Sequence, residues 1–132
     1  MIVLDCSAAV EMARGTAKGI ELLAQLESES TKIVPSLFYS EAANAVWKYV
    51  HAGQWEADKA VEAFERISAM PSVIVKTERL SGEALREACR LDHSVYDMTY
   101  VVLARRTGAT LVTLDKHLAG LCSQLGVATL LA

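Results

Sequence analysis

The chain has 132 residues, of which 52% are hydrophobic and 22% are charged, a composition that excludes a disordered chain and suffices for one hydrophobic core. Its formal net charge of −3 does not indicate a protein that holds nucleic acid by bulk positive charge, but it weakens a nuclease hypothesis only slightly, because bound divalent cations would invert the local field of an acidic site. Neither a signal peptide nor an apolar run approaching the ~20 residues of a membrane span can be recognised, so we expect a soluble, cytoplasmic protein without a membrane partner.

Short apolar runs alternate with helix-forming segments along the whole chain. Such runs are typical of strands that are buried on both faces of a parallel sheet. The predicted elements, in chain order, are a strand at Ile2–Leu4, helices at Ser7–Ala13 and Ala17–Ser28, a strand at Lys32–Val34, helices at Leu37–His51 and Trp55–Ala69, a strand at Val73–Val75, helices at Arg79–Leu91 and Val95–Arg106, a strand at Thr110–Leu114, a helix near His117–Leu125 and a strand at Val127–Leu130. We predict an α/β fold, a three-layer α/β/α sandwich with a central parallel sheet of about five short strands, formed by residues 1–132 as one domain.

Two acidic residues directly follow predicted strands. Asp5 comes after the first strand and Asp115 after the fourth. In an open parallel sheet, ligands bind at the carboxyl ends of the strands. We therefore expect both carboxylates at the same edge of the sheet.

Two further acidic residues lie near the starts of helices that begin at that edge. Glu41 is about one turn into the helix that follows the second strand, beside the apolar stripe of that helix. Asp97 lies in the first turn of the helix that leads into the fourth strand. Because a helix that feeds a parallel strand runs back across the sheet, its N-terminus lies at the same carboxyl edge.

The topology therefore predicts a cluster of Asp5, Glu41, Asp97 and Asp115. Like charges at close range repel one another, so such a cluster is most stable around a cation. Ligands that are all oxygen suit Mg²⁺ or Mn²⁺ rather than zinc. The chemistry that this predicts is the hydrolysis of a phosphate ester.

Each of these residues has a structural alternative when it is taken alone. Asp5 and Asp115 fit helix N-caps, and Asp97 fits a capping box that starts at Ser94. Glu41 also fits a partly exposed carboxylate at the edge of a helix face. Ser7 is either an N-cap or a hydroxyl that hydrogen-bonds a metal ligand. Only the convergence of the four acids on one edge of the sheet favours a metal site over these structural alternatives.

Four segments spread along the whole chain carry a recognisable pattern: Ile2–Ser7, Ser40–Ala45, Tyr96–Ala104 and Leu111–Leu118. Together, and in this order, they resemble the PIN-domain ribonucleases, specifically the VapC-type toxins of type II toxin–antitoxin systems. The first segment resembles the strand-Asp-x-Ser start of the family, and the third is very similar to its "YDALYVALA" stretch. No acid follows closely after Asp115, where some PIN nucleases carry one.

The resemblance implies a Mg²⁺- or Mn²⁺-dependent endoribonuclease that acts on structured RNA, such as tRNA or rRNA. It implies Asp5 and Asp97 as the principal metal ligands, Glu41 and Asp115 as residues that complete the acidic pocket, and Ser7 as support for the first ligand. It also implies a homodimer and a cognate antitoxin protein.

Two other functions remain open on the sequence. One is a non-catalytic PIN-like interaction module, which loss of an acid would indicate, and none is lost here. The other is a different metal-dependent phosphoryl-transfer domain. A haloacid-type phosphatase should carry Asp-x-Asp after the first strand, whereas this chain has Asp5-Cys6-Ser7.

Overall fold

The computed structural model describes residues 1–28 and 31–131, which contain one five-stranded sheet. The strand order is β3-β2-β1-β4-β5, and every neighbouring pair is parallel. This confirms the predicted sheet and places β1 in its centre. The strands are β1 (Ile2–Leu4), β2 (Lys32–Pro35), β3 (Val73–Val75), β4 (Thr110–Thr113) and β5 (Thr129–Leu131).

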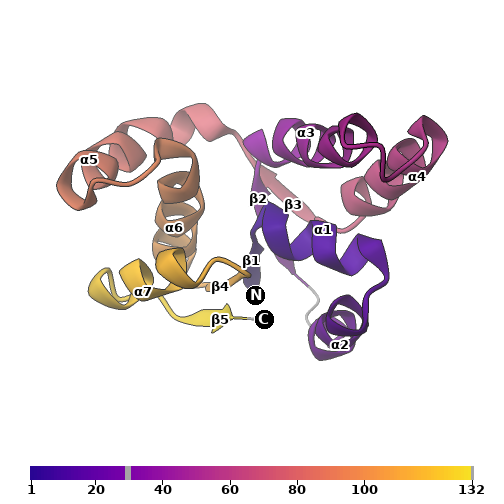
Figure 1. The fold of residues 1–132 in the computed structure, drawn as a ribbon. Coiled ribbons are helices and arrows are strands. Elements are labelled where there is room, and N and C mark those ends of the chain that lie inside the picture. Colours follow the sequence, from indigo (N-terminus) through magenta and orange to yellow (C-terminus); the bar gives the residue numbers. More distant parts are fainter. Residues whose placement is uncertain (29–30, 132) are drawn as a thin grey trace.

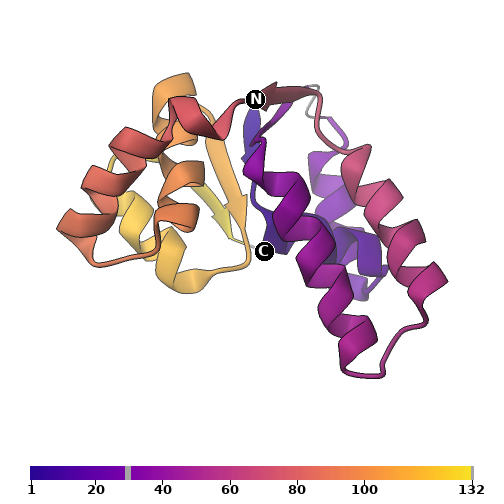
Figure 2. The same ribbon diagram turned by 90° about the horizontal axis from the view of Figure 1, so that it is seen from above.

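Helices cover both faces of the sheet, which confirms the predicted three-layer α/β/α architecture. In Figure 1 the sheet is seen nearly edge-on, with α1–α4 on one side and α5–α7 on the other. The view from above in Figure 2 shows the same two layers, with α3 and α4 side by side at the outer edge of one of them. The helices are α1 (Cys6–Arg14), α2 (Ala17–Leu26), α3 (Leu37–His51), α4 (Ala57–Ser68), α5 (Ser81–Leu91), α6 (Val95–Thr107) and α7 (Lys116–Gln124), with a 3-10 turn, η1, at Thr77–Arg79.

Helix α6 is the central element of its layer. Every residue from Met98 to Ala104 in it is buried, and it contacts β1, β2 and β4. A helix that is buried on all sides needs apolar residues all round, as the run Val101–Ala104 supplies.

Within the described residues, no helix has both the length and the apolar character needed to cross a membrane.

The helix boundaries differ from the prediction by two residues at three places and by at most one residue elsewhere. Helix α2 ends at Leu26 rather than Ser28. Trp55 lies before α4 because its ring stacks on Tyr49, with centroids 4.4 Å apart, and its backbone N–H donates to the Tyr49 carbonyl. Arg79 belongs to η1, which Thr77 ties to the start of α3 by accepting a 2.8 Å hydrogen bond from the backbone N–H of Leu37.

Helices α1 and α2 meet at Gly19, where a side chain has no room. A Cβ atom at this position would overlap the carbonyl oxygen of Glu11. We expect Gly19→Ala to lower the free energy of unfolding by about 1–3 kcal/mol, the usual cost of overpacking. Gly120→Ala is the control, because a Cβ on this exposed position of α7 meets nothing within 4 Å, and it should stabilise the protein by up to about 1 kcal/mol. Urea unfolding measures both, and equal effects of the two substitutions would contradict the prediction.

Candidate active site

Asp5 lies at the carboxyl end of the central strand and is 7% exposed. Leu4 pairs with Val112, which brings Asp5 beside Thr113 of β4. Thr113 Oγ1 donates a 2.6 Å hydrogen bond to Asp5 Oδ2, and Ser7 Oγ donates a 2.9 Å bond to the same oxygen. Asp5 is the N-cap residue of α1, but its side chain makes no capping hydrogen bond. The hydroxyls of strand and helix therefore fix the orientation of this carboxylate.

Glu41 projects from α3 and is held by the buried Tyr100 of α6. The Tyr100 hydroxyl donates a 2.6 Å hydrogen bond to Glu41 Oε1. Burial raises the pKa of the Glu41 carboxyl; the bond from Tyr100 opposes this rise, and the negative charges of Asp5 and Asp97 add to it. Tyr100 has no functional role in the sequence prediction, although it lies three residues after Asp97 on the same helix.

Asp97 and Asp115 lie at the starts of α6 and α7. Asp115 Oδ1 accepts hydrogen bonds of 2.9 and 3.1 Å from the backbone N–H groups of His117 and Leu118, so the N-cap alternative is confirmed for this residue. Asp97 instead makes a 2.8 Å contact between its Oδ2 and Nε2 of His93. His93 has no role in the sequence prediction, because it precedes the helix and its distance from Asp97 depends on the loop.

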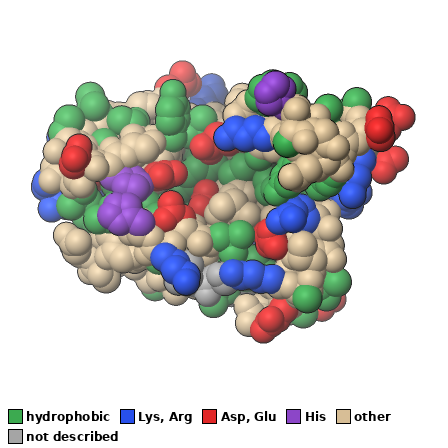
Figure 3. Space-filling view, viewed as in Figure 1, with side chains coloured by type: hydrophobic (Ala, Val, Ile, Leu, Met, Phe, Trp, Pro, Cys, Tyr) green, Lys and Arg blue, Asp and Glu red, His purple; other side chains and the backbone are tan. Residues whose placement is uncertain are grey.

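All four predicted acids line one cavity of about 660 Å³. Figure 3 shows acidic side chains gathered in the middle of this face, with histidines on one side of them and lysine or arginine side chains on the other. Ser7, Asn44 and Lys48 also line this cavity. The predicted convergence of Asp5, Glu41, Asp97 and Asp115 on one cavity is thus present. Among the described residues, potential metal-ligating atoms that all lie within 4.8 Å of one another come from two of these acids, Asp97 and Asp115, and from His93.

Among the described residues, no recorded ion pair joins one of the four acids to a lysine or an arginine. The arginine ion pairs within residues 1–28 and 31–131 involve Glu11, Glu83 and Glu87 instead, and the recorded ion pair of Asp97 is with His93. Arg105 and Arg106, two adjacent arginines in the last turn of α6, both pair with Glu83. Carboxylate oxygens that repel one another and have no recorded lysine or arginine partner form a donor set that fits a divalent cation of the Mg²⁺ or Mn²⁺ type.

The protonation of Asp5 and Glu41 makes the stability of the metal-free protein dependent on pH. Burial raises the pKa of the Asp5 carboxyl, the hydrogen bonds from Thr113 and Ser7 oppose the rise, and the charge of Asp97 adds to it. A carboxyl that holds its proton to higher pH in the folded state than in the unfolded state stabilises the fold fully at low pH. That contribution is lost as the pH rises through the raised pKa.

We therefore expect Asp5→Asn, which has no charge to bury, to raise the melting temperature of the metal-free protein at about pH 7 and to change it little below about pH 4. Glu83→Gln is the opposite control, because the hydrogen bonds and charges of Arg105 and Arg106 lower the pKa of the Glu83 carboxyl. That variant should be less stable at neutral pH. Thermal unfolding in EDTA at both pH values tests the pair, and a lower melting temperature of Asp5→Asn at neutral pH would count against the argument.

Comparison with known proteins gives the family. The model of the PIN domain matches residues 2–123. The chain belongs to the PIN-domain family. A sequence relative, Ribonuclease VapC3 from Pyrobaculum aerophilum, is 35% identical over 83 residues, which cover 60% of this chain and 62% of that relative. The chain thus matches less than two thirds of the length of this curated relative.

Solved structures agree with this PIN fold. PAE2754 from Pyrobaculum aerophilum superposes with a TM-score of 0.75 at 22% identity, covering 97% of this chain and 82% of that chain. VapBC2 from Rickettsia felis, solved with a DNA fragment from its promoter, gives a TM-score of 0.72 at 16% identity and covers 100% and 99%. At these identities the likeness concerns the fold alone.

Proposed function

We propose that this PIN domain is a Mg²⁺- or Mn²⁺-dependent endoribonuclease that hydrolyses RNA phosphodiester bonds. The observation that carries the proposal is the cavity lined by Asp5, Glu41, Asp97 and Asp115, none of which forms a recorded ion pair with a lysine or arginine of the described residues. The partial match to a ribonuclease of the VapC type supports it.

The four acids divide into two roles in this proposal. Asp5 and Asp97 are the principal metal ligands, and Glu41 and Asp115 complete the acidic pocket. When bound, the cation supplies positive charge for the phosphodiester oxygens and lowers the pKa of water enough for it to act as the nucleophile. The residues of the chain hold these ligands in place: Ser7 and Thr113 orient Asp5, and Tyr100 orients Glu41.

Lys48 is the residue best placed to contact the RNA backbone near this site. It projects from α3 and lines the same cavity as the acids, next to Asn44. A lysine ammonium group binds a phosphate as a point charge and carries no sequence preference. The specificity for tRNA or rRNA that the resemblance implies must therefore come from other contacts with the RNA.

Removal of the metal tests the proposal. Purified protein freed of any bound partner should cleave total RNA, tRNA or rRNA in Mg²⁺ or Mn²⁺, and EDTA should reduce the rate by at least about 100-fold, because the cation contributes several kcal/mol to the transition state. Readdition of Mn²⁺ should restore the rate. Cleavage that survives EDTA would argue for a contaminating nuclease. A folded protein that binds metal and cleaves none of the three RNAs would favour an interaction module.

We also propose that the chain is the toxin of a toxin–antitoxin pair in the cytoplasm, forms a homodimer and is inhibited by a cognate antitoxin. The likeness to the toxin–antitoxin complex VapBC2 supports a protein partner. Exposed apolar side chains on α3 and α4, Trp47 at 53% and Val61 at 57%, are compatible with protein contacts. Light scattering of the purified protein measures its mass in solution, and a monomeric mass would contradict the homodimer.

A further inference from the structure

His93 is an imidazole side chain held at the rim of the acidic cavity. It lies between α5 and α6, directly after Asp92, whose left-handed backbone (φ 51°) ends α5. The backbone N–H of His93 donates to the carbonyl of Ala88, 3.1 Å away, which fixes the start of this connection. Its side chain is only 13% exposed and lies beside the ring of His117, with ring centroids 5.0 Å apart. The imidazole is therefore placed by the fold rather than free in solvent.

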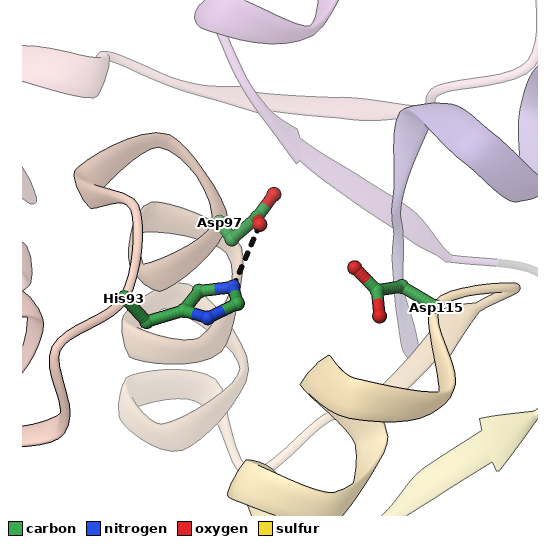
Figure 4. Close-up of side chains that lie close together, drawn as sticks. All are labelled: His93, Asp97 and Asp115. Atoms are coloured by element: carbon green, nitrogen blue, oxygen red, sulfur yellow. Dashed lines mark hydrogen bonds and ion pairs between the residues drawn. The ribbon is translucent and has the colours of Figure 1, made fainter.

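The ring of His93 points at the two carboxylates that begin α6 and α7. Potential ligand atoms of His93, Asp97 and Asp115 all lie within 4.8 Å of one another. Figure 4 shows the imidazole and both carboxylates directed toward the same space from three different segments. The contact between His93 Nε2 and Asp97 Oδ2 measures 2.8 Å. Neighbouring ligands of an octahedral cation, each about 2.1 Å from it, lie roughly 3 Å apart, so this pair already has the spacing of two ligands of one ion.

An imidazole nitrogen among the ligands changes which cations a metal site prefers. Sites made of carboxylate and water suit Mg²⁺ and Mn²⁺ alike, whereas an imidazole ligand suits transition metals and is a poor ligand for Mg²⁺. On the basis of the metal site proposed for the ribonuclease, we propose that His93 is a direct metal ligand together with Asp97 and Asp115, and that it makes this site prefer Mn²⁺ to Mg²⁺. The alternative is that His93 only orients Asp97 through a hydrogen bond.

The test measures the metal rather than RNA cleavage. Mn²⁺ is added to the purified protein, and electron spin echo spectroscopy detects the magnetic coupling of the bound ion to a directly coordinated nitrogen. Mn²⁺ and Mg²⁺ dissociation constants are measured by calorimetry on the same samples. Two variants separate the roles of His93: His93→Leu removes both ligand and hydrogen bond, whereas His93→Gln keeps a side-chain N–H that can donate to Asp97. His117→Leu removes the neighbouring imidazole, and His51→Leu is the control on the exposed end of α3.

We expect a nitrogen signal in the original protein, in His117→Leu and in His51→Leu, and its loss in both His93 variants. Loss of the ligand should weaken Mn²⁺ binding by about 10- to 100-fold and Mg²⁺ binding by much less. A nitrogen signal that persists in His93→Leu would overturn the proposal. Mn²⁺ affinity that His93→Gln restores would also overturn it, because a hydrogen bond would then explain the effect. Circular dichroism establishes that each variant is folded.

These outcomes distinguish the role of His93 as a metal ligand from the proposed ribonuclease activity. A protein that binds Mn²⁺ through His93 but cleaves no RNA supports this inference and contradicts the proposed activity. A protein that cleaves RNA in Mn²⁺ without a nitrogen signal keeps the activity and overturns the role of His93. A protein that binds neither metal overturns the metal site and this inference together.

Discussion

Asp97→Asn is expected to reduce RNA cleavage by about 1,000-fold, because Asp97 is a proposed principal metal ligand and its loss would remove several kcal/mol of stabilisation from the transition state. Asparagine has nearly the same shape, and its amide oxygen can take the place of the Asp97 Oδ2 that lies 2.8 Å from Nε2 of His93. The change therefore removes the negative charge and one carboxylate oxygen with little effect on packing. Initial rates of RNA cleavage in saturating Mg²⁺ and Mn²⁺ measure the effect.

Asp58→Asn is the matched control for this substitution. Asp58 is also an acid in the first turn of a helix, α4, so both variants lose the same favourable interaction with the helix dipole. Asp58 is exposed and does not line the cavity, and its variant should cleave at the original rate. If Asp97→Asn retained cleavage within a fewfold of the original protein, Asp97 could not be a principal metal ligand.

Thr113→Val is expected to weaken metal binding by about 10- to 100-fold, the usual effect of removing a group that orients a ligand. The hydroxyl of Thr113 connects two of the acids, since it donates to Asp5 Oδ2 and accepts a 3.0 Å bond from the backbone N–H of Asp115. Valine keeps the branched shape that β4 needs but offers neither bond. The pKa of the Asp5 carboxyl should rise further, because a bond that lowers it is lost.

Thr99→Val provides the control for loss of a buried hydroxyl. Thr99 is 1% exposed, and its Oγ1 donates a 2.8 Å bond to the carbonyl of Val95 within α6 rather than to a carboxylate. Thr113→Val should lose about 1–3 kcal/mol of stability, because the backbone N–H of Asp115 loses its partner. Thr99→Val should change stability less, because the Val95 carbonyl keeps its backbone hydrogen bond within the helix. Only Thr113→Val should shift the Mn²⁺ dissociation constant measured by calorimetry. Equal shifts in the two variants would show that the effect is general destabilisation.

The four acids were predictable because their position depends on chain topology. Asp5 and Asp115 follow strands, and in a parallel sheet the carboxyl ends of β1 and β4 lie side by side whatever the details of packing. Glu41 and Asp97 begin helices at that edge for the same reason. Their structural alternatives were decided by side-chain contacts: Asp115 caps α7, whereas the Asp5 side chain accepts from Ser7 and Thr113 instead of capping α1.

The amino-acid sequence by itself determined the succession of strands and helices along the chain, the three-layer architecture and the edge of the sheet on which the acids gather. These features follow from apolar periodicity and chain direction. Only the tertiary structure decided which side chains hold those acids. Tyr100 reaches Glu41 across 59 positions, and Thr113 reaches Asp5 across 108. His93 meets Asp97 through a turn at Asp92 with a backbone conformation that few residues other than glycine adopt. Such contacts depend on helix packing and loop geometry, which local sequence patterns do not encode.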